Sequence, residues 1–259
     1  MKSILISILT LFLFVPAKIN AELFTNPSAN IGRKNLVVGA EYSATKNEYN
    51  LDTKNLPVQS ERALLKATTG LTDWLDIYVK GGGARLLLDY REIDTSVIEN
   101  FDSKMQFGFG AGARVRLLNY VNSGTQVFLQ GGGFFFKNTG TIEKSNNITQ
   151  TTTDRSIKWL DLNAGIGVSK RIDYAEFNFG IGLSDIKWWL DDTIKQKIIG
   201  GGTASGQSKR DSFEVRNPLF GFFGVDFVLP LEYRLSAQVG IRSAKSAEFT
   251  VAISQGLEK

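Results

Sequence analysis

Apolar and polar residues alternate along most of this chain with a period of two. The segment Lys104–Leu117 shows the alternation most clearly: every second residue from Met105 onward is apolar, and the residues between them are glycine, lysine, glutamine or arginine. Successive side chains of a β-strand point to opposite faces, so this segment has one wholly apolar face and one polar face. The period therefore predicts a strand with two unlike faces.

The same alternation recurs along the chain and predicts ten strands, joined by short turns and longer polar connections in turn. The strands are expected at Lys34–Ala44, Glu61–Leu71, Trp74–Arg85, Lys104–Leu117, Thr125–Lys137, Ser156–Lys170, Ala175–Lys187, Arg216–Leu229, Glu232–Ser243 and Ser246–Gly256. The long polar connections are expected at Thr45–Ser60, Leu86–Ser103, Asn138–Arg155 and Trp188–Val215.

An apolar sheet face requires a cover, and a lipid bilayer supplies one when the sheet closes and leaves no unpaired edge. The alternation of short turns with long loops is typical of such barrels. We therefore predict an all-β fold, a closed antiparallel transmembrane β-barrel of about ten strands, with eight or twelve as alternatives. The segment Leu190–Ile199 also has apolar residues spaced four apart, so a short helix or plug and an extension of the preceding strand both remain open there.

The first residues have the pattern of an export signal. Lys2 precedes the apolar run Ile4–Val15, which is too short to cross a bilayer as a helix, and Ala21 ends a plausible cleavage site. We expect residues 1–21 to be a signal peptide and residues 22–259 to form the barrel domain.

Composition argues against several kinds of function. The 259 residues include no cysteine and no histidine, so thiol chemistry and the commonest general base and metal ligand are missing. The formal charge of +4 comes from lysines and arginines scattered among acids, which disfavours nucleic-acid binding. We expect no enzymatic activity, no catalytic residues, no cofactor, no metal and no nucleic-acid partner.

The segment Gly70–Leu71–Thr72–Asp73–Trp74–Leu75–Asp76 places a glycine-led turn between two predicted strands. With the alternation from Asn35 to Gln255, it resembles small bacterial outer-membrane β-barrel proteins, including the OmpA-like, OmpW-like and opacity-type porin families. The resemblance implies the outer membrane of a Gram-negative bacterium. It also implies a monomer in contact with outer-membrane lipids and lipopolysaccharide, and small solutes in the lumen.

Charged residues fall on the parity that would face the lumen. Acids and bases are mixed, so a charged constriction that selects ions and a salt-bridged filling of a narrow lumen are both open, the second being favoured. Phe128, Phe134, Phe220 and Phe222 share this parity, and we expect them to pack against neighbouring glycines rather than to line a ligand site. The lumen-facing charges are expected to be Arg62, Lys66, Asp76, Lys80, Arg114, Arg116, Asp161, Glu176, Asp226, Arg234, Arg242 and Glu248.

Function in such a barrel depends on its lumen and its loops rather than on its fold. We expect a porin-like narrow channel for small solutes or ions. The alternative is a closed structural or surface-recognition barrel that acts, like an adhesin, through its long outer loops.

Overall fold

The computed structural model describes residues 36–51, 54–91, 98–145, 149–198, 205–214, 219–243 and 246–257. The predicted signal peptide, residues 1–21, lies outside the described residues. The division of the chain into residues 1–21 and a barrel domain from residue 22 therefore stays a prediction.

The described residues form twelve β-strands and two short 3₁₀ turns. No helix in these ranges is long and apolar enough to cross a membrane. The elements are β1 (Leu36–Leu51), β2 (Lys54–Gly70), β3 (Leu75–Arg91), β4 (Ile98–Asp102), β5 (Gln106–Tyr120), η1 (Val121–Ser123), β6 (Thr125–Ser145), β7 (Thr149–Ile172), β8 (Ala175–Ile198), β9 (Ser205–Glu214), β10 (Leu219–Val228), η2 (Pro230–Glu232), β11 (Tyr233–Ser243) and β12 (Ser246–Leu257).

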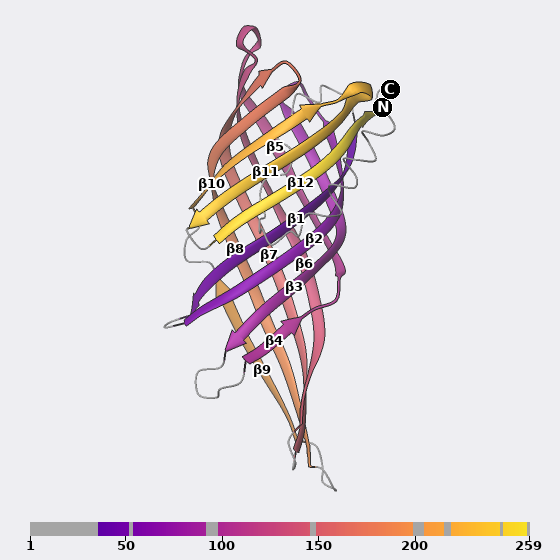
Figure 1. The fold of residues 1–259 in the computed structure, drawn as a ribbon, viewed down its shortest axis with the longest axis vertical. Coiled ribbons are helices and arrows are strands. Elements are labelled where there is room, and N and C mark those ends of the chain that lie inside the picture. Colours follow the sequence, from indigo (N-terminus) through magenta and orange to yellow (C-terminus); the bar gives the residue numbers. More distant parts are fainter. Residues whose placement is uncertain are drawn as a thin grey trace.

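Ten of these strands close into a ring of antiparallel neighbours (Figure 1). Its order is β1–β2–β3–β5–β6–β7–β8–β10–β11–β12, and β12 pairs back onto β1 from Leu36↔Leu257 to Lys46↔Ala247. The short strand β4 pairs with β3 beyond the end of β5, and the short strand β9 pairs with β8 beyond the end of β10. In the order around the ring, β4 therefore takes the place of β5, and β9 takes the place of β10. The prediction of a closed ten-stranded antiparallel barrel is confirmed.

The two ends of the barrel differ in their connections. At one end, which we call the turn end, β1 begins, β12 ends and four short connections follow β2, β5, β7 and β10. At the other end, which we call the extension end, β6, β7, β8 and β9 continue as a four-stranded sheet past the rim (Figure 1). We call this sheet the extension.

The predicted long loops are largely wrong, because strands occupy most of those residues. The ladder between β6 and β7 continues to Ser145↔Gln150, and β8 runs to Ile198, which excludes a helix over the described part of Leu190–Ile199. The residues expected at Thr45–Ser60 likewise pair across β1 and β2 as far as Leu51↔Lys54. Threonines and charged residues stay in the ladder because each strand has a partner beside it that accepts its backbone hydrogen bonds.

The outer surface of the barrel carries the predicted apolar face. Leu65 and Phe107 are each 72% exposed, although both are large and apolar. A closed sheet with such an exterior has the construction of a transmembrane barrel, in which lipid covers the outward side chains. Other exposed apolar residues on this surface are Val79, Phe109, Ile166, Phe179, Ile181, Leu183, Leu219, Phe223, Val239, Ile241 and Ile253.

Because Ile166 points outward, its depth in the membrane can be tested by substitution. Ile166 lies on the exterior of β7 midway between Leu160 and Ile172 and is paired with Leu129 and Ile181, so Ile166→Arg is expected to destabilise the barrel folded in lipid by about 2–4 kcal/mol. Ile172→Arg is the control, because Ile172 ends the same strand near the rim, where the same change costs about 0–1 kcal/mol. Urea-titrated folding into phospholipid vesicles measures both, and equal losses would contradict the assigned depth.

Candidate functional site in the barrel interior

Charged side chains of opposite sign meet inside the barrel near the turn end. Arg116 Nη2 lies 3.8 Å from Asp76 Oδ2 on the neighbouring strand β3. Arg114, nearly buried, is within electrostatic range of Glu176, Asp76 and Asp226. Because the two bases face three acids from different strands, the charges at this end largely offset one another.

Arg62 crosses the middle of the interior. It is fully buried on β2, and its Nη1 lies 4.0 Å from Oδ2 of Asp161 on β7. Its guanidinium carbon stands 4.6 Å from the ring centroid of Phe134, within the range of a cation–π contact. Since β3, β5 and β6 separate β2 from β7 around the ring, this contact joins two walls of the barrel rather than two neighbours.

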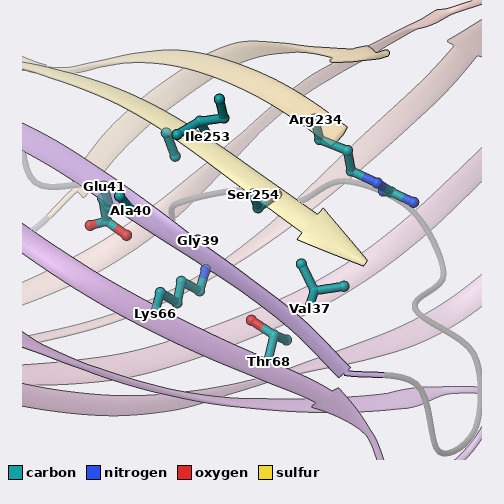
Figure 2. Close-up of a pocket in the computed structure, with 10 residues that line it drawn as sticks. Val37, Gly39, Ala40, Glu41, Lys66, Thr68, Arg234, Ile253 and Ser254 are labelled. Atoms are coloured by element: carbon teal, nitrogen blue, oxygen red, sulfur yellow. The ribbon is translucent and has the colours of Figure 1, made fainter. Parts of the chain in front are cut away.

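A small cavity lies nearer the turn end, between β1, β2, β11 and β12 (Figure 2). Its volume is about 30 Å³, which accommodates about one water molecule. Lys66, Thr68, Glu41, Arg234 and Ser254 provide its polar lining, and Glu41 Oε1 also lies 3.5 Å from Lys80 Nζ. The cavity is far too small to take a solute of the size that porins pass.

The remaining predicted lumen charges are more dispersed. Glu248 is buried on β12, and Arg234 is half-buried beside the cavity. The side chain of Arg242 lies outside the described part of the structure. Apart from Arg242, the structure places all the predicted lumen charges inside the barrel, but it brings them into several separate contacts rather than into one constriction.

A group of apolar side chains fills the interior toward the extension end. Trp159 and Trp188 stack with ring centroids 6.3 Å apart, and Phe136 stacks on Trp159 at 5.9 Å. Fully buried aliphatic residues such as Leu86 and Ile186 surround these rings. We call this group the plug; its members are Val58, Leu64, Ala84, Leu86, Leu88, Phe101, Phe134, Phe136, Ile157, Trp159, Ile186, Trp188 and Leu190.

The sequence interpretation missed the plug because it placed several of its members in loops. Leu86 and Leu88 fell in one predicted loop, and Trp188 and Leu190 in another. The available signal was parity, since Leu86 continues the inward positions of Asp76 and Lys80, and Trp188 those of Glu176. The alternation that named the lumen charges therefore also pointed to the apolar residues beyond them.

An ion pair joins β7 and β8 just beyond the plug, toward the end of the extension. Arg155 donates from Nε to Asp192 Oδ1 at 2.9 Å and from Nη2 to Oδ2 at 2.7 Å, and both side chains are nearly buried. The Asn138 amide donates nearby to the carbonyls of Ala84 and Lys104, at 3.1 Å and 3.2 Å. The Asn138 contacts join β6 to β3 and to the residue two positions before β5, whereas the Arg155–Asp192 pair cross-links the neighbouring strands β7 and β8 of the extension.

The inward phenylalanines pack over inward glycines, as predicted. A Cβ added at Gly167 would lie 2.5 Å from Phe128 Cζ, and one at Gly182 would lie 2.6 Å from Phe220 Cζ. Gly108 is covered in the same way by Phe134, at 2.7 Å. Each ring occupies the volume that a side chain on the glycine would need, so the interior is filled from one strand into the gap left by another.

No family model matches the chain, and no curated protein matches it. Among solved structures, the chain is similar to the translocator domain of the autotransporter NalP from Neisseria meningitidis, with 10% identity, a TM-score of 0.44, and coverage of 92% of this chain and 91% of that one.

Two further solved structures are similar at comparable levels. The COG4313 outer membrane channel from Pseudomonas putida F1 has 11% identity and a TM-score of 0.40, with coverage of 91% of this chain and all of that one. Ail, the attachment invasion locus protein of Yersinia pestis, in complex with a heparin analogue, has 14% identity and a TM-score of 0.31, with coverage of 86% and 96%. All these TM-scores are below 0.5, so no activity or residue role is carried over from these proteins, and the predicted OmpA-like, OmpW-like or opacity-type subfamily stays a prediction.

The phenylalanine–glycine packing predicts a suppressor. Gly167→Ala should destabilise the barrel by about 1–3 kcal/mol, because its methyl group meets the Phe128 and Phe222 rings. Combining it with Phe128→Leu, which shortens the facing side chain, should cost less than the two separate losses added together. Unfolding in urea measures the single and double variants, and strictly additive losses would contradict this contact.

The Arg155–Asp192 pair predicts strong coupling. Asp192→Ala leaves a nearly buried guanidinium without its bidentate partner, so a loss of about 3 kcal/mol is expected. The double variant Arg155→Met/Asp192→Ala should recover part of that loss. A double-mutant cycle in urea gives the coupling energy, and a value near zero would mean that the pair does not cross-link β7 and β8.

Proposed function

We propose that this chain is an outer-membrane β-barrel with a closed interior that acts through its extension as a structural or surface-recognition protein. The observation that carries the proposal is the plug. Trp159, Trp188 and Phe136 are each at most 1% exposed, and their rings stack across three neighbouring strands inside the barrel.

A path for ions through the interior would have to pass the plug, whose packed side chains offer little space and few polar groups. The plug presents aromatic and aliphatic surface, and a narrow apolar section of a pore excludes water. On the facing wall, Arg62 reaches over Phe134 toward Asp161 and occupies the space between. The packing thus favours the closed alternative over the porin-like channel expected from the sequence.

The lengths of the connections support a location in the outer membrane and indicate which end of the barrel would face the periplasm. Bacterial outer-membrane barrels have short turns on the periplasmic side and longer segments outside. The turn end would therefore face the periplasm, and the extension would stand outside the cell. The apolar exterior between them, including Leu65, Phe107 and Ile181, is the surface that lipid would cover.

The extension has the features of a rigid recognition surface. Lys195 Nζ donates to Asp154 Oδ2 at 2.8 Å, and Arg210 Nε donates to Asp191 Oδ1 at 2.6 Å, each between neighbouring strands. The hydrogen bond from Lys195 lowers the pKa of Asp154, and the one from Arg210 lowers the pKa of Asp191. Both acids stay ionised at neutral pH and cross-link a polar, exposed sheet that a partner can reach.

Planar-bilayer recording tests the closed interior. The wild-type protein, folded in detergent and inserted, is expected to give no single-channel steps. The triple variant Phe136→Ala/Trp159→Ala/Trp188→Ala removes the stacked rings and should give measurable conductance, because it leaves space where the plug excluded water.

The control for this experiment is Phe179→Ala, which removes one exposed aromatic ring from the outer face and should stay silent. Heat-modifiable gel migration verifies that each variant is folded. Steady conductance from the folded wild-type protein would overturn the closed interior and restore the channel interpretation.

A further inference from the structure

Two lysines face each other on the outer surface of the barrel. Lys137 on β6 is directly opposite Lys158 on β7 in the ladder, and both side chains point outward. Like charges placed directly opposite on one face of a sheet are unfavourable. An anion bound between the two ammonium groups would offset this repulsion.

The anions of the chain compensate this pair only in part. Lys158 Nζ lies 3.4 Å from Asp191 Oδ2, but the other oxygen of Asp191 accepts from Arg210. Within the described residues Lys137 makes no ion pair. Lys137, Lys158 and Arg210 against Asp191 leave two positive charges in excess. Lys187 is close by, but it lies 3.6 Å from Asp185 and is opposite Glu214 in the ladder, so it adds little to the excess.

Aromatic residues flank the lysine pair in the same row across the strands. Trp189 on β8 is opposite Lys158 and half-buried. On the other side, Phe107 precedes Gly108, the partner of Phe136, so it stands beside Lys137 and is 72% exposed. One row toward the turn end lie Phe135 and Leu160, which belong to the apolar exterior. The pair therefore lies at the level where the apolar surface gives way to the polar extension.

We propose that Lys137 and Lys158 bind the phosphate groups of a phosphorylated glycolipid in the outer leaflet, the class to which lipid A of lipopolysaccharide belongs. The excess positive charge matches a phosphate, and the aromatic residues on either side suit the boundary between head groups and acyl chains. The adjoining apolar surface at Phe109 and Phe135, whose rings lie 5.8 Å apart, would contact the acyl chains. The inference rests on the proposed orientation of the barrel in the outer membrane.

A lipid satisfies this surface better than a free phosphate ion does. Exposed lysines bind a lone anion weakly in salt, because the charges are solvated and screened. A lipid held against the barrel by its acyl chains brings its phosphates to the lysines at high local concentration. Both parts of the surface, charged and apolar, are then used together.

Native mass spectrometry of the folded full-length chain in detergent tests the proposal, with diphosphorylated lipid A and its dephosphorylated form as probes. The double variant Lys137→Gln/Lys158→Gln should bind diphosphorylated lipid A about tenfold more weakly than the wild type. Lys137→Arg/Lys158→Arg should keep the affinity, because it keeps the charges. The dephosphorylated lipid should bind the wild type and the glutamine variant equally weakly.

The matched control is Lys195→Gln/Lys197→Gln, which removes two exposed lysines from the same face of β8, roughly 20 Å beyond Trp189, and should leave the affinity unchanged. Inorganic phosphate at the same concentration should not displace the lipid; displacement would show a free-phosphate site and overturn the lipid assignment. Equal binding of the two lipids, or full affinity in the glutamine variant, would also overturn it. Heat-modifiable migration reports folding, and bilayer recordings report the closed interior, so failure here is distinguishable from failure of the proposed function.

Discussion

In a bilayer, each unpaired backbone N–H or C=O costs several kcal/mol, and an open sheet edge would expose a whole row of them. The pairing of β12 with β1, from Leu36↔Leu257 to Lys46↔Ala247, removes that edge. The rest of the structure depends on this closure. It separates an inside from an outside, which lets one parity of each strand meet lipid and the other meet the opposite wall.

The closed ring allows two different fillings along one interior. Near the turn end, Asp76, Arg114 and Asp226 bring opposite charges from different strands together, and glycines leave space for phenylalanine rings. Toward the extension end, the same inward positions carry Leu86, Trp159 and other members of the plug. The second filling resembles the core of a soluble protein, although the outer face of the sheet at that level already carries Lys137 and Lys158. Closed packing of this kind favours a structural or surface-recognition barrel over a channel.

The extension and the barrel form one continuous sheet. Because β6, β7 and β8 pass from the lipid-covered region to the polar extension without interruption, the Asn138 amide on β6 fixes the extension to the rim at Ala84 and Lys104, and the pair Arg155–Asp192 cross-links β7 and β8 beside it. The proposed binding surface at Lys137 and Lys158 lies at this transition on the outer face. A lipid bound there would contact the strands that carry the extension, which connects the two proposals physically without making one depend on the lumen.

The sequence by itself determined the fold class, the number of strands around the ring and the direction of most strand residues. Alternation is a local property, so it assigned Ile166 to the lipid and Asp161 to the interior without any knowledge of neighbours. The same argument foresaw phenylalanines over glycines, because large and small residues shared the inward parity. It did not extend to strand ends, since threonine-rich segments such as Thr149–Thr153 look like loops until a neighbouring strand is there to pair with them.

Only the tertiary structure decided which inward residues meet. Arg62 and Asp161 are nearly a hundred positions apart in sequence, and their contact depends on ring closure and on the register of every strand between them. The plug depends on the same registers, because Phe136, Trp159 and Trp188 stack only when three ladders align. An alternation with a period of two indicates which way a side chain points, but it does not indicate which residue lies across the lumen from it. For that physical reason the sequence left the lumen open to two interpretations, and the packing favours the closed one.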